Sequence, residues 1–118
     1  MPVLSVNGVG LHYVLEGRAG APVVALSNSL STDMRMWEPQ MAALTARYRV
    51  LRYDVRGHGK SEAAAAPYSV EMLADDLAGL IDGLGLEPVH VVGLSLGGMT
   101  AQVLAVRRPE LVASLGLV

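Results

Sequence analysis

The residue best suited to chemistry is Ser95, in the sequence Gly93-Leu94-Ser95-Leu96-Gly97. A predicted strand ends at Gly93 and a predicted helix begins at Leu96, which is the setting in which a G-x-S-x-G pattern is informative. In so tight a turn the strand and the helix nearly collide, and Gly93 and Gly97 lack the Cβ atoms that would clash. We therefore predict a strained turn, the elbow (residues 93–97), that exposes the Ser95 hydroxyl at the carboxyl edge of a sheet.

The helix that follows Ser95 supplies the second part of this chemistry. The first turn of a helix leaves backbone N–H groups unpaired and carries a partial positive charge. The Leu96 N–H is therefore the expected first donor to an oxyanion, with Ser95 as the nucleophile of an acyl transfer. The alternative is a glycine-rich turn that contains a serine with no catalytic role. The flanking strand, the flanking helix and the paired glycines favour the catalytic interpretation.

The elements that must position Ser95 alternate between strands and helices. A hairpin is predicted first, with strands at 3–6 and 11–15 around an Asn7-Gly8 turn. Further short apolar runs have the composition of buried strands and lie at 23–26, 50–54, 89–93 and 115–118. Helices are predicted from Pro39 onward, over 70–84 with Ser69 as N-cap and Gly85 as terminator, and over 96–107. This order predicts an α/β fold with a mixed, mostly parallel sheet.

The composition narrows the possible classes of protein. A chain of 118 residues, 52% hydrophobic and 17% charged, forms one globular domain. The net charge of -2 gives no indication of nucleic-acid or membrane binding. Cysteine is absent, which excludes disulfides, thiolate catalysis and cysteine-based metal sites. No apolar stretch reaches the ~20 residues of a membrane span and no signal-peptide pattern is present, so a cytoplasmic location is expected. The oligomeric state stays open.

Three motifs, in order along the chain, resemble those of α/β-hydrolases. Ser27-Asn28-Ser29-Leu30 follows the first buried strand, where many relatives carry His-Gly and an apolar residue. Residues 54–61, DVRGHGKS, match the D-x-R-G-x-G-x-S loop, and Gly93 to Gly98 match the nucleophile elbow. The resemblance covers nearly the whole chain. It implies that residues 1–118 are the N-terminal portion of a single α/β-hydrolase domain, truncated before the cap and the last strands.

Within that family, residues 26–30, 36–40 and 50–54 resemble those of 3-oxoadipate enol-lactonases, which open an enol-lactone during aromatic-acid degradation. The resemblance implies that the Leu30 N–H is the second oxyanion donor, opposite the Leu96 N–H. It also implies a small ester or lactone substrate and no metal or organic cofactor. Serine at the elbow, where dehalogenases and epoxide hydrolases use aspartate, points to acyl transfer. Perhydrolases also carry serine and stay open.

Three residues near the predicted oxyanion loop are candidates for a substrate pocket: Ser29, Arg35 and Trp37. Arg35 is suited to a substrate carboxylate, with a solvated arginine as the plainer alternative. Trp37 is interpreted as packing or pocket wall. Asp54 and Arg56 are expected to organise their own loop through hydrogen bonds and an ion pair. A solvated helix face, rather than a metal site, is predicted for Asp75, Asp76 and Asp82.

In the family, the catalytic acid and then the base follow the serine, but no aspartate or histidine follows Ser95 in this sequence. His12 is interpreted as a surface or hairpin residue and His90 as a strand-start residue. His58 is the one candidate surrogate base. Two functions stay open. The first is a serine hydrolase of the enol-lactonase type, with its acid and base beyond Val118. The second is a non-catalytic truncated module that binds a ligand or partner, its last strand an exposed apolar edge.

Overall fold

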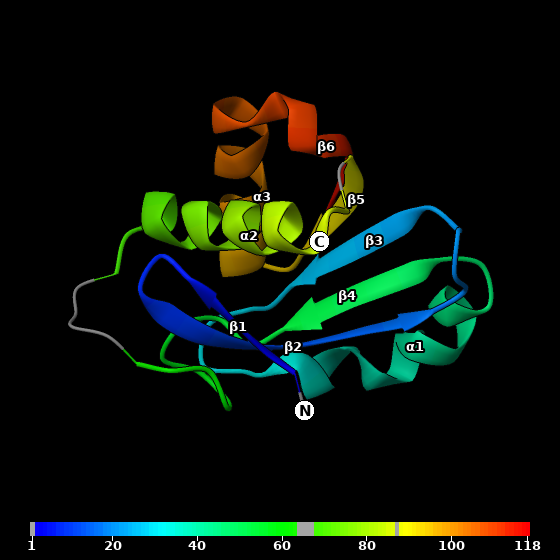
Figure 1. Ribbon diagram of the computed structural model, residues 1–118, viewed down its shortest axis with the longest axis horizontal. Helices are drawn as coiled ribbons and strands as arrows, with labels where there is room; N and C mark the ends of the chain where they lie inside the picture. Colours follow the sequence, from blue (N-terminus) through cyan, green and yellow to red (C-terminus); the bar gives the residue numbers. More distant parts are fainter. Residues whose placement is uncertain (1, 64–67, 87) are drawn as a thin grey trace.

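The computed structural model describes residues 2–63, 68–86 and 88–118. These residues form one sheet in the order β1-β2-β4-β3-β5-β6 (Figure 1). The strands are Val3–Val6 (β1), Val9–Gly17 (β2), Val23–Ser27 (β3), Arg49–Tyr53 (β4), Val89–Gly93 (β5) and Val112–Leu117 (β6). Strand β2 pairs antiparallel with β1 and β4, whereas β3 pairs parallel with β4 and β5, and β5 parallel with β6. The predicted mixed, mostly parallel sheet is confirmed.

Two strands are longer than predicted by two residues or more. The hairpin turn is confirmed, since Asn7 and Gly8 both have positive φ, 49° and 83°, as a two-residue turn of type I′ requires. Strand β2 runs on to Gly17 because it pairs with β4 along its second half, where Gly17 lies opposite Arg49. Strand β6 begins three residues before the predicted start, because Val112 already lies opposite Val89.

The helices follow local signals in the sequence. Helix α1 (Glu38–Thr45) carries Pro39 in its first turn and is preceded by a 3-10 turn, η1 (Met34–Trp37), that was not predicted. Helix α2 (Val70–Leu84) begins where the Ser69 hydroxyl accepts a 3.1 Å hydrogen bond from the Met72 N–H, and ends at Gly85 with φ 66°. Helix α3 (Leu96–Arg107) is followed by a second 3-10 turn, η2 (Pro109–Leu111).

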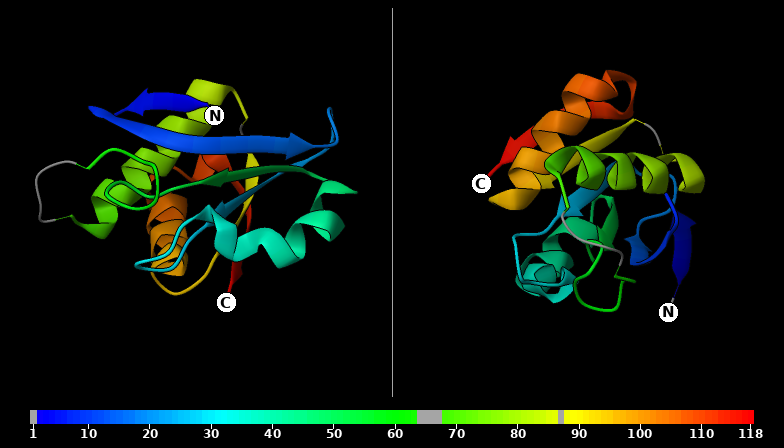
Figure 2. Two further views of the ribbon diagram at one scale, coloured as in Figure 1. Left: turned by 90° about the horizontal axis from the view of Figure 1, so that it is seen from below. Right: turned by 90° about the vertical axis from the view of Figure 1, so that its left-hand side faces the viewer.

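The helices divide the molecule into layers. Helices α2 and α3 lie on one face of the sheet and α1 on the other, as Figure 1 and both views of Figure 2 show. The larger core lies under α2 and α3 and includes Leu77, Ile81 and Leu104. A smaller core, with Leu26, Trp37 and Met41 among its members, lies under α1. The central strands are therefore buried on both faces, as parallel strands are.

One charged residue of α2 contradicts its prediction. Asp76 is only 2% exposed and binds Arg56 through both carboxylate oxygens, at 2.6 and 2.8 Å, while the Asn7 amide donates to it at 3.1 Å. The predicted solvated position is wrong for Asp76, because this side of α2 lies against the hairpin turn and the loop after β4. Arg56 also lies 5.8 Å from the centroid of the Tyr68 ring. The ion pair expected of Arg56 therefore joins two elements, and Asp54 is not part of it.

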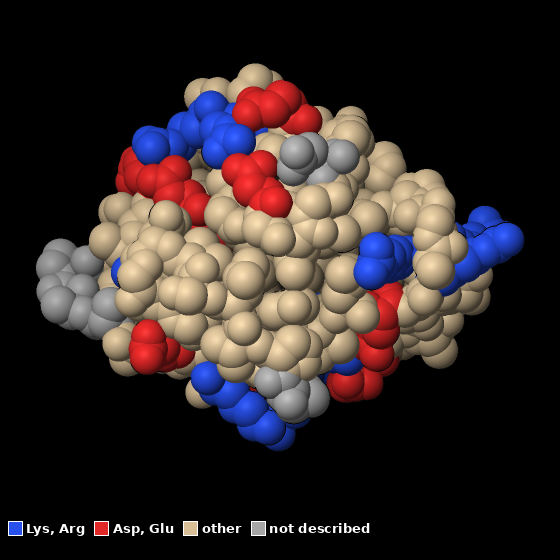
Figure 3. Space-filling model, viewed as in Figure 1, with Lys and Arg blue, Asp and Glu red and all other residues tan. Residues whose placement is uncertain are grey.

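Asp75 and Asp82, the other two residues of this prediction, lie at the surface as predicted. Asp75 pairs with Arg107, and Asp82 pairs with Arg108. Figure 3 shows basic and acidic groups side by side at the top of the molecule, above a broad area without charged side chains. No helix in the described part of the chain is both long and apolar enough to cross a membrane.

Candidate active site

The elbow around Ser95 has the predicted strain. Ser95 links β5 to α3 with φ 55° and ψ -112°, a combination outside the regions that L-residues ordinarily occupy. Such a backbone costs about 1–3 kcal/mol and persists only where the surroundings enforce it. The side chain of Ser95 is exposed, and its N–H points toward the Val118 carbonyl at 3.4 Å. The exposed serine and the strained turn predicted from the sequence are confirmed.

The two elbow glycines allow close backbone contacts. A Cβ at Gly93 would collide with the carbonyl of Gly97 and lie 2.5 Å from the nitrogen of Gly98. A Cβ at Gly97 would collide with the carbonyl of Ser27 and lie 2.8 Å from that of Asn28. Gly97 thus lets the loop after β3 lie directly against the start of α3. This contact brings the predicted oxyanion loop next to Ser95.

Asn28 holds that loop in place, a role that the sequence did not reveal. It is 1% exposed; its amide nitrogen donates to the Tyr53 carbonyl at 2.7 Å, and its amide oxygen accepts from the Trp37 indole at 2.7 Å. It therefore ties the end of β3 to the end of β4 and to η1. The Leu94 N–H adds a 3.2 Å hydrogen bond to the Ser27 carbonyl. A polar residue directly after a buried strand was the available signal.

The two predicted oxyanion donors lie on the two segments that meet at Gly97, the loop after β3 and the start of α3. Leu30 is 64% exposed and follows Ser29, whose carbonyl accepts a 2.6 Å hydrogen bond from the Thr32 hydroxyl. Leu96 is the first residue of α3. Within the described part of the chain, neither the Leu30 N–H nor the Leu96 N–H donates to another group. Both amides are available to a ligand, although their catalytic role stays a prediction.

The three candidate pocket residues do not line one cavity. Trp37 lines an apolar groove of about 610 Å³ beside the elbow, together with Leu94 and Val118. Ser29 lies next to η1, where its hydroxyl is 3.8 Å from the Met36 sulfur. Arg35 lies elsewhere: its guanidinium binds the Asp33 carboxylate at 2.7 Å and lowers the pKa of Asp33 to about 2. The Arg35 side chain is mostly exposed to solvent, as the alternative interpretation of this residue predicted.

None of the three histidines makes a hydrogen bond to Ser95 in the described structure. His58 contacts the Arg56 carbonyl at 3.1 Å within its own loop, and His90 contacts the Ser114 hydroxyl at 2.7 Å on the neighbouring strand. His12 lies in the hairpin, as predicted, but is 4% exposed and thus buried. Among the described residues, no three His, Cys, Asp or Glu side chains lie close enough to hold a metal ion.

Comparison with known proteins identifies the family of this chain and several similar proteins. Residues 14–118 match the family described as alpha/beta hydrolase fold. The chain belongs to the α/β hydrolase fold family. An enol-lactonase from Burkholderia xenovorans LB400 superposes with a TM-score of 0.94 and 47% identity, over 97% of this chain and 45% of that one.

Two sets of curated relatives are also similar to the chain. The 3-oxoadipate enol-lactonase 2 of Acinetobacter baylyi is 39% identical over 107 residues, which are 91% of this chain and 40% of that enzyme. The putative carbamate hydrolase RutD of Caulobacter vibrioides is 44% identical over 112 residues, 92% of this chain and 42% of that protein. The chain spans about two fifths of the length of these relatives. The family resemblance and the fold predicted from the sequence are both confirmed.

Proposed function

We propose that this protein is a serine hydrolase that opens small esters or lactones with Ser95 as its nucleophile. The observation that carries the proposal is the elbow itself. An exposed serine with φ 55° stands between β5 and α3, and the backbone on both sides approaches too closely for any residue but glycine at 93 and 97. A strained backbone costs free energy. Here the strain exposes the Ser95 hydroxyl, which a nucleophile needs in order to reach a substrate.

The proposed reaction begins with attack of the Ser95 hydroxyl oxygen on the substrate carbonyl. The negative charge that develops on the carbonyl oxygen is held by the Leu30 and Leu96 N–H groups, which have no other acceptor in the described structure. The enol or alcohol oxygen then leaves with a proton, and water hydrolyses the acyl-serine. The proton of Ser95 needs a base, and we assign that role to a histidine beyond Val118, preceded by the acid that orients it.

For the substrate we propose an enol-lactone of the 3-oxoadipate type. The similar proteins named enol-lactonase support this choice, and so does the apolar groove that Leu94 and Trp37 line beside the elbow. A carbamate is the competing substrate, since the RutD proteins are similarly close to this chain. Both substrates present a carbonyl to the same serine, so the comparison of their hydrolysis rates decides between them.

The nucleophile is tested by labelling the chain with a fluorophosphonate in the absence and presence of imidazole. Imidazole supplies the base that no described residue offers to Ser95, so we expect it to accelerate labelling at least tenfold. Mass spectrometry locates the modified residue. S95A must abolish the accelerated labelling, whereas S5A, at an exposed serine on β1, must retain it. Labelling that survives S95A contradicts the proposal.

The second candidate is a non-catalytic module that binds a ligand or another chain. One observation favours it: in the described structure no histidine or carboxylate side chain makes a hydrogen bond to Ser95. In that case Ser95 is not labelled even with imidazole, while the folded chain still binds its ligand. Knock-outs of catalytic triads retain roughly 10³–10⁴-fold catalysis over water, so weak turnover alone does not exclude this module.

A further inference from the structure

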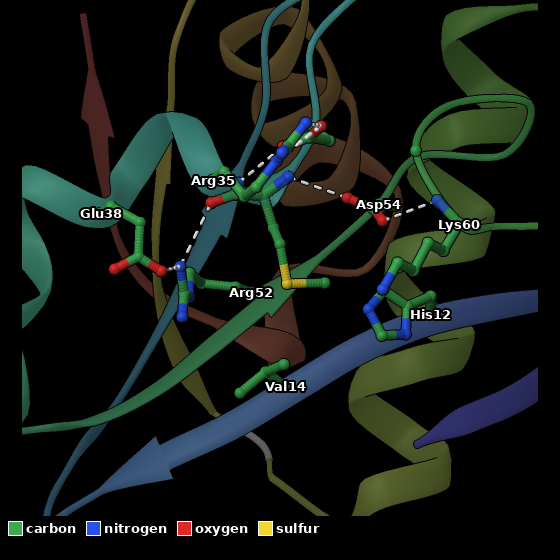
Figure 4. Close-up of a pocket in the computed structure, with 10 residues that line it drawn as sticks. His12, Val14, Arg35, Glu38, Arg52, Asp54 and Lys60 are labelled. Carbon is green, nitrogen blue, oxygen red and sulfur yellow. Dashed lines mark hydrogen bonds and ion pairs between the residues drawn. The ribbon is translucent and has the colours of Figure 1, made fainter. Parts of the chain in front are cut away.

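A second cavity, of about 430 Å³, lies away from the elbow. Strands β2 and β4, the segment before α1 and the loop after β4 surround it (Figure 4). Its lining includes His12, Val14, Met34, Arg52, Asp54 and Lys60. Neither Ser95 nor the two predicted oxyanion donors contribute to it. The volume is within the usual range of small-molecule sites, about 300–1,000 Å³.

Each acidic side chain that lines this cavity already has partners. Asp33 binds Arg35 at 2.7 Å, and Glu38 binds Arg52 at 2.8 Å. The Asp54 carboxylate accepts two backbone hydrogen bonds, at 2.8 and 2.9 Å, one to each oxygen. These partners bind both oxygens of Asp33, both oxygens of Asp54 and one oxygen of Glu38.

Two nitrogen-bearing side chains of the lining have no partner in the described structure, and a third, Arg52, has one unpaired atom, its buried Nε. The backbone of His12 is satisfied, by the Ser61 hydroxyl at 2.8 Å and the Asp54 N–H at 2.9 Å, but its ring makes no hydrogen bond to any described residue. The side chain is nonetheless 96% buried, and its ring faces the cavity. The Lys60 ammonium is likewise without a partner in the described structure. The ring nitrogens of His12 are not among the fully buried unpaired atoms of the described residues, so they reach the open cavity, where a ligand or solvent can bind them.

We propose that this cavity binds a small carboxylate with a short apolar body. The carboxylate accepts hydrogen bonds from the Lys60 ammonium and the His12 ring N–H, as charge-assisted pairs do. The side chains of Val14 and Met34 form the apolar wall for the rest of the ligand, and Met34 is 5% exposed. In Figure 4 the Lys60 side chain extends toward the His12 ring, on the side of the cavity opposite Arg52. This site does not depend on the hydrolase proposal.

The composition of the chain offers a selective probe, because Lys60 is its single lysine. Reductive methylation with ¹³C-formaldehyde labels the Lys60 amine and the N-terminal amine and preserves their charge. We expect butyrate to shift the Lys60 methyl signal along a saturable curve, with the N-terminal signal as internal control. Butyramide has the same size without the charge and is expected to bind at least tenfold more weakly. Equal shifts by the two compounds, or shifts that never saturate, overturn the proposal.

Variants in an S95A background keep this test separate from catalysis. A ligand that binds the folded state raises the midpoint of thermal unfolding. Butyrate is expected to raise it for the S95A parent and for Arg47→Met, which removes an exposed cation outside the cavity, but not for Lys60→Met. Inorganic phosphate serves as the second anion. If phosphate stabilises the parent as strongly as butyrate, the site recognises charge alone and the proposed carboxylate class is wrong. Loss of the butyrate effect in Arg47→Met also contradicts the proposal.

Discussion

Gly97 and Gly98 are neighbours in α3, yet a methyl group would meet different surroundings at each. At Gly97 it would collide with the Ser27 carbonyl, whereas at Gly98 its nearest contact is an ordinary 3.4 Å. We expect Gly97→Ala to destabilise the fold by about 3 kcal/mol, the upper part of the range for overpacking, and to abolish labelling of Ser95. Gly98→Ala is expected to stay within about 1 kcal/mol of the parent, since alanine favours a helix. Urea unfolding measures both, and equal losses would contradict the close contact at Gly97.

Tyr53 makes stability depend on pH in the alkaline range. Burial raises the pKa of its phenol to about 12, although the hydrogen bond with Ser27 opposes the shift. Because the folded state holds this proton more tightly than the unfolded state, the contribution is fully present below the ordinary pKa near 10 and is lost between about pH 10 and 12. A shift of two units corresponds to roughly 3 kcal/mol. Unfolding by urea at pH 9, 10 and 11 measures the loss.

Tyr53→Phe is the control for this pH dependence. It removes the titrating group and its 3.2 Å contact with the Ser27 hydroxyl but keeps the ring. The variant is expected to be less stable at pH 8 and to lose less stability than the parent between pH 9 and 11. Parallel curves for the two proteins would show that another group causes the alkaline loss.

At the scale of elements, the Arg56–Asp76 pair joins α2 to the loop after β4, and Asn7 connects both to the hairpin. Asp76→Ala leaves the Arg56 guanidinium, 6% exposed, without its partner, and is expected to cost about 3–5 kcal/mol. Asp75→Ala is the matched control on the same helix, because its pair with Arg107 is about half exposed and is worth at most about 1 kcal/mol. Thermal unfolding compares them. Similar losses would mean that the buried pair does not join these elements.

Much of the secondary structure was predictable because its signals are local. The Asn7-Gly8 turn, the Ser69 cap and the terminating Gly85 each act through the backbone of a few neighbouring residues. The burial of Asp76 and His12 was not predictable in this way, since it depends on segments distant in sequence that lie against them. The turn η1 had a local signal that the prediction overlooked, because the Asp33 carboxylate accepts a 2.9 Å hydrogen bond from the Arg35 N–H. Its distant contact, from the Met34 N–H to the Asp54 carboxylate, was not predictable.

In the candidate site, too, the features set by local sequence were predictable and those set by distant contacts were not. Ser95 and its two glycines could be predicted because one tight turn determines all three positions. The separation of Arg35 from Trp37 could not, because it depends on which side of η1 each side chain takes. Asn28 likewise acts through the carbonyl of Tyr53, to which no sequence pattern links it.

At the scale of the whole molecule, β6 leaves one edge of the sheet open, as the apolar last strand predicted. Unpaired strand edges with exposed apolar side chains promote association between chains. For residues 1–118 prepared as a separate chain, we expect self-association with rising concentration, and we expect Leu117→Lys to reduce that association several-fold. Val106→Lys changes an equally apolar residue that is 83% exposed on α3, away from the edge, and is expected to have little effect. Light scattering after size-exclusion chromatography measures the masses, and equal effects would contradict association through β6.

The position of β3 also has a consequence for how quickly the chain folds. This strand is central, yet its partners come from distant parts of the sequence: Val23 lies opposite Arg49, and Val24 opposite His90. Neither pairing can form before a long segment has been closed into a loop. This closure lowers the entropy of the chain before any stabilising contact has formed. Domains with such high contact order refold in milliseconds to seconds rather than microseconds. The Ser95 elbow, which β3 supports through Ser27, is therefore expected to be among the last parts of the molecule to form.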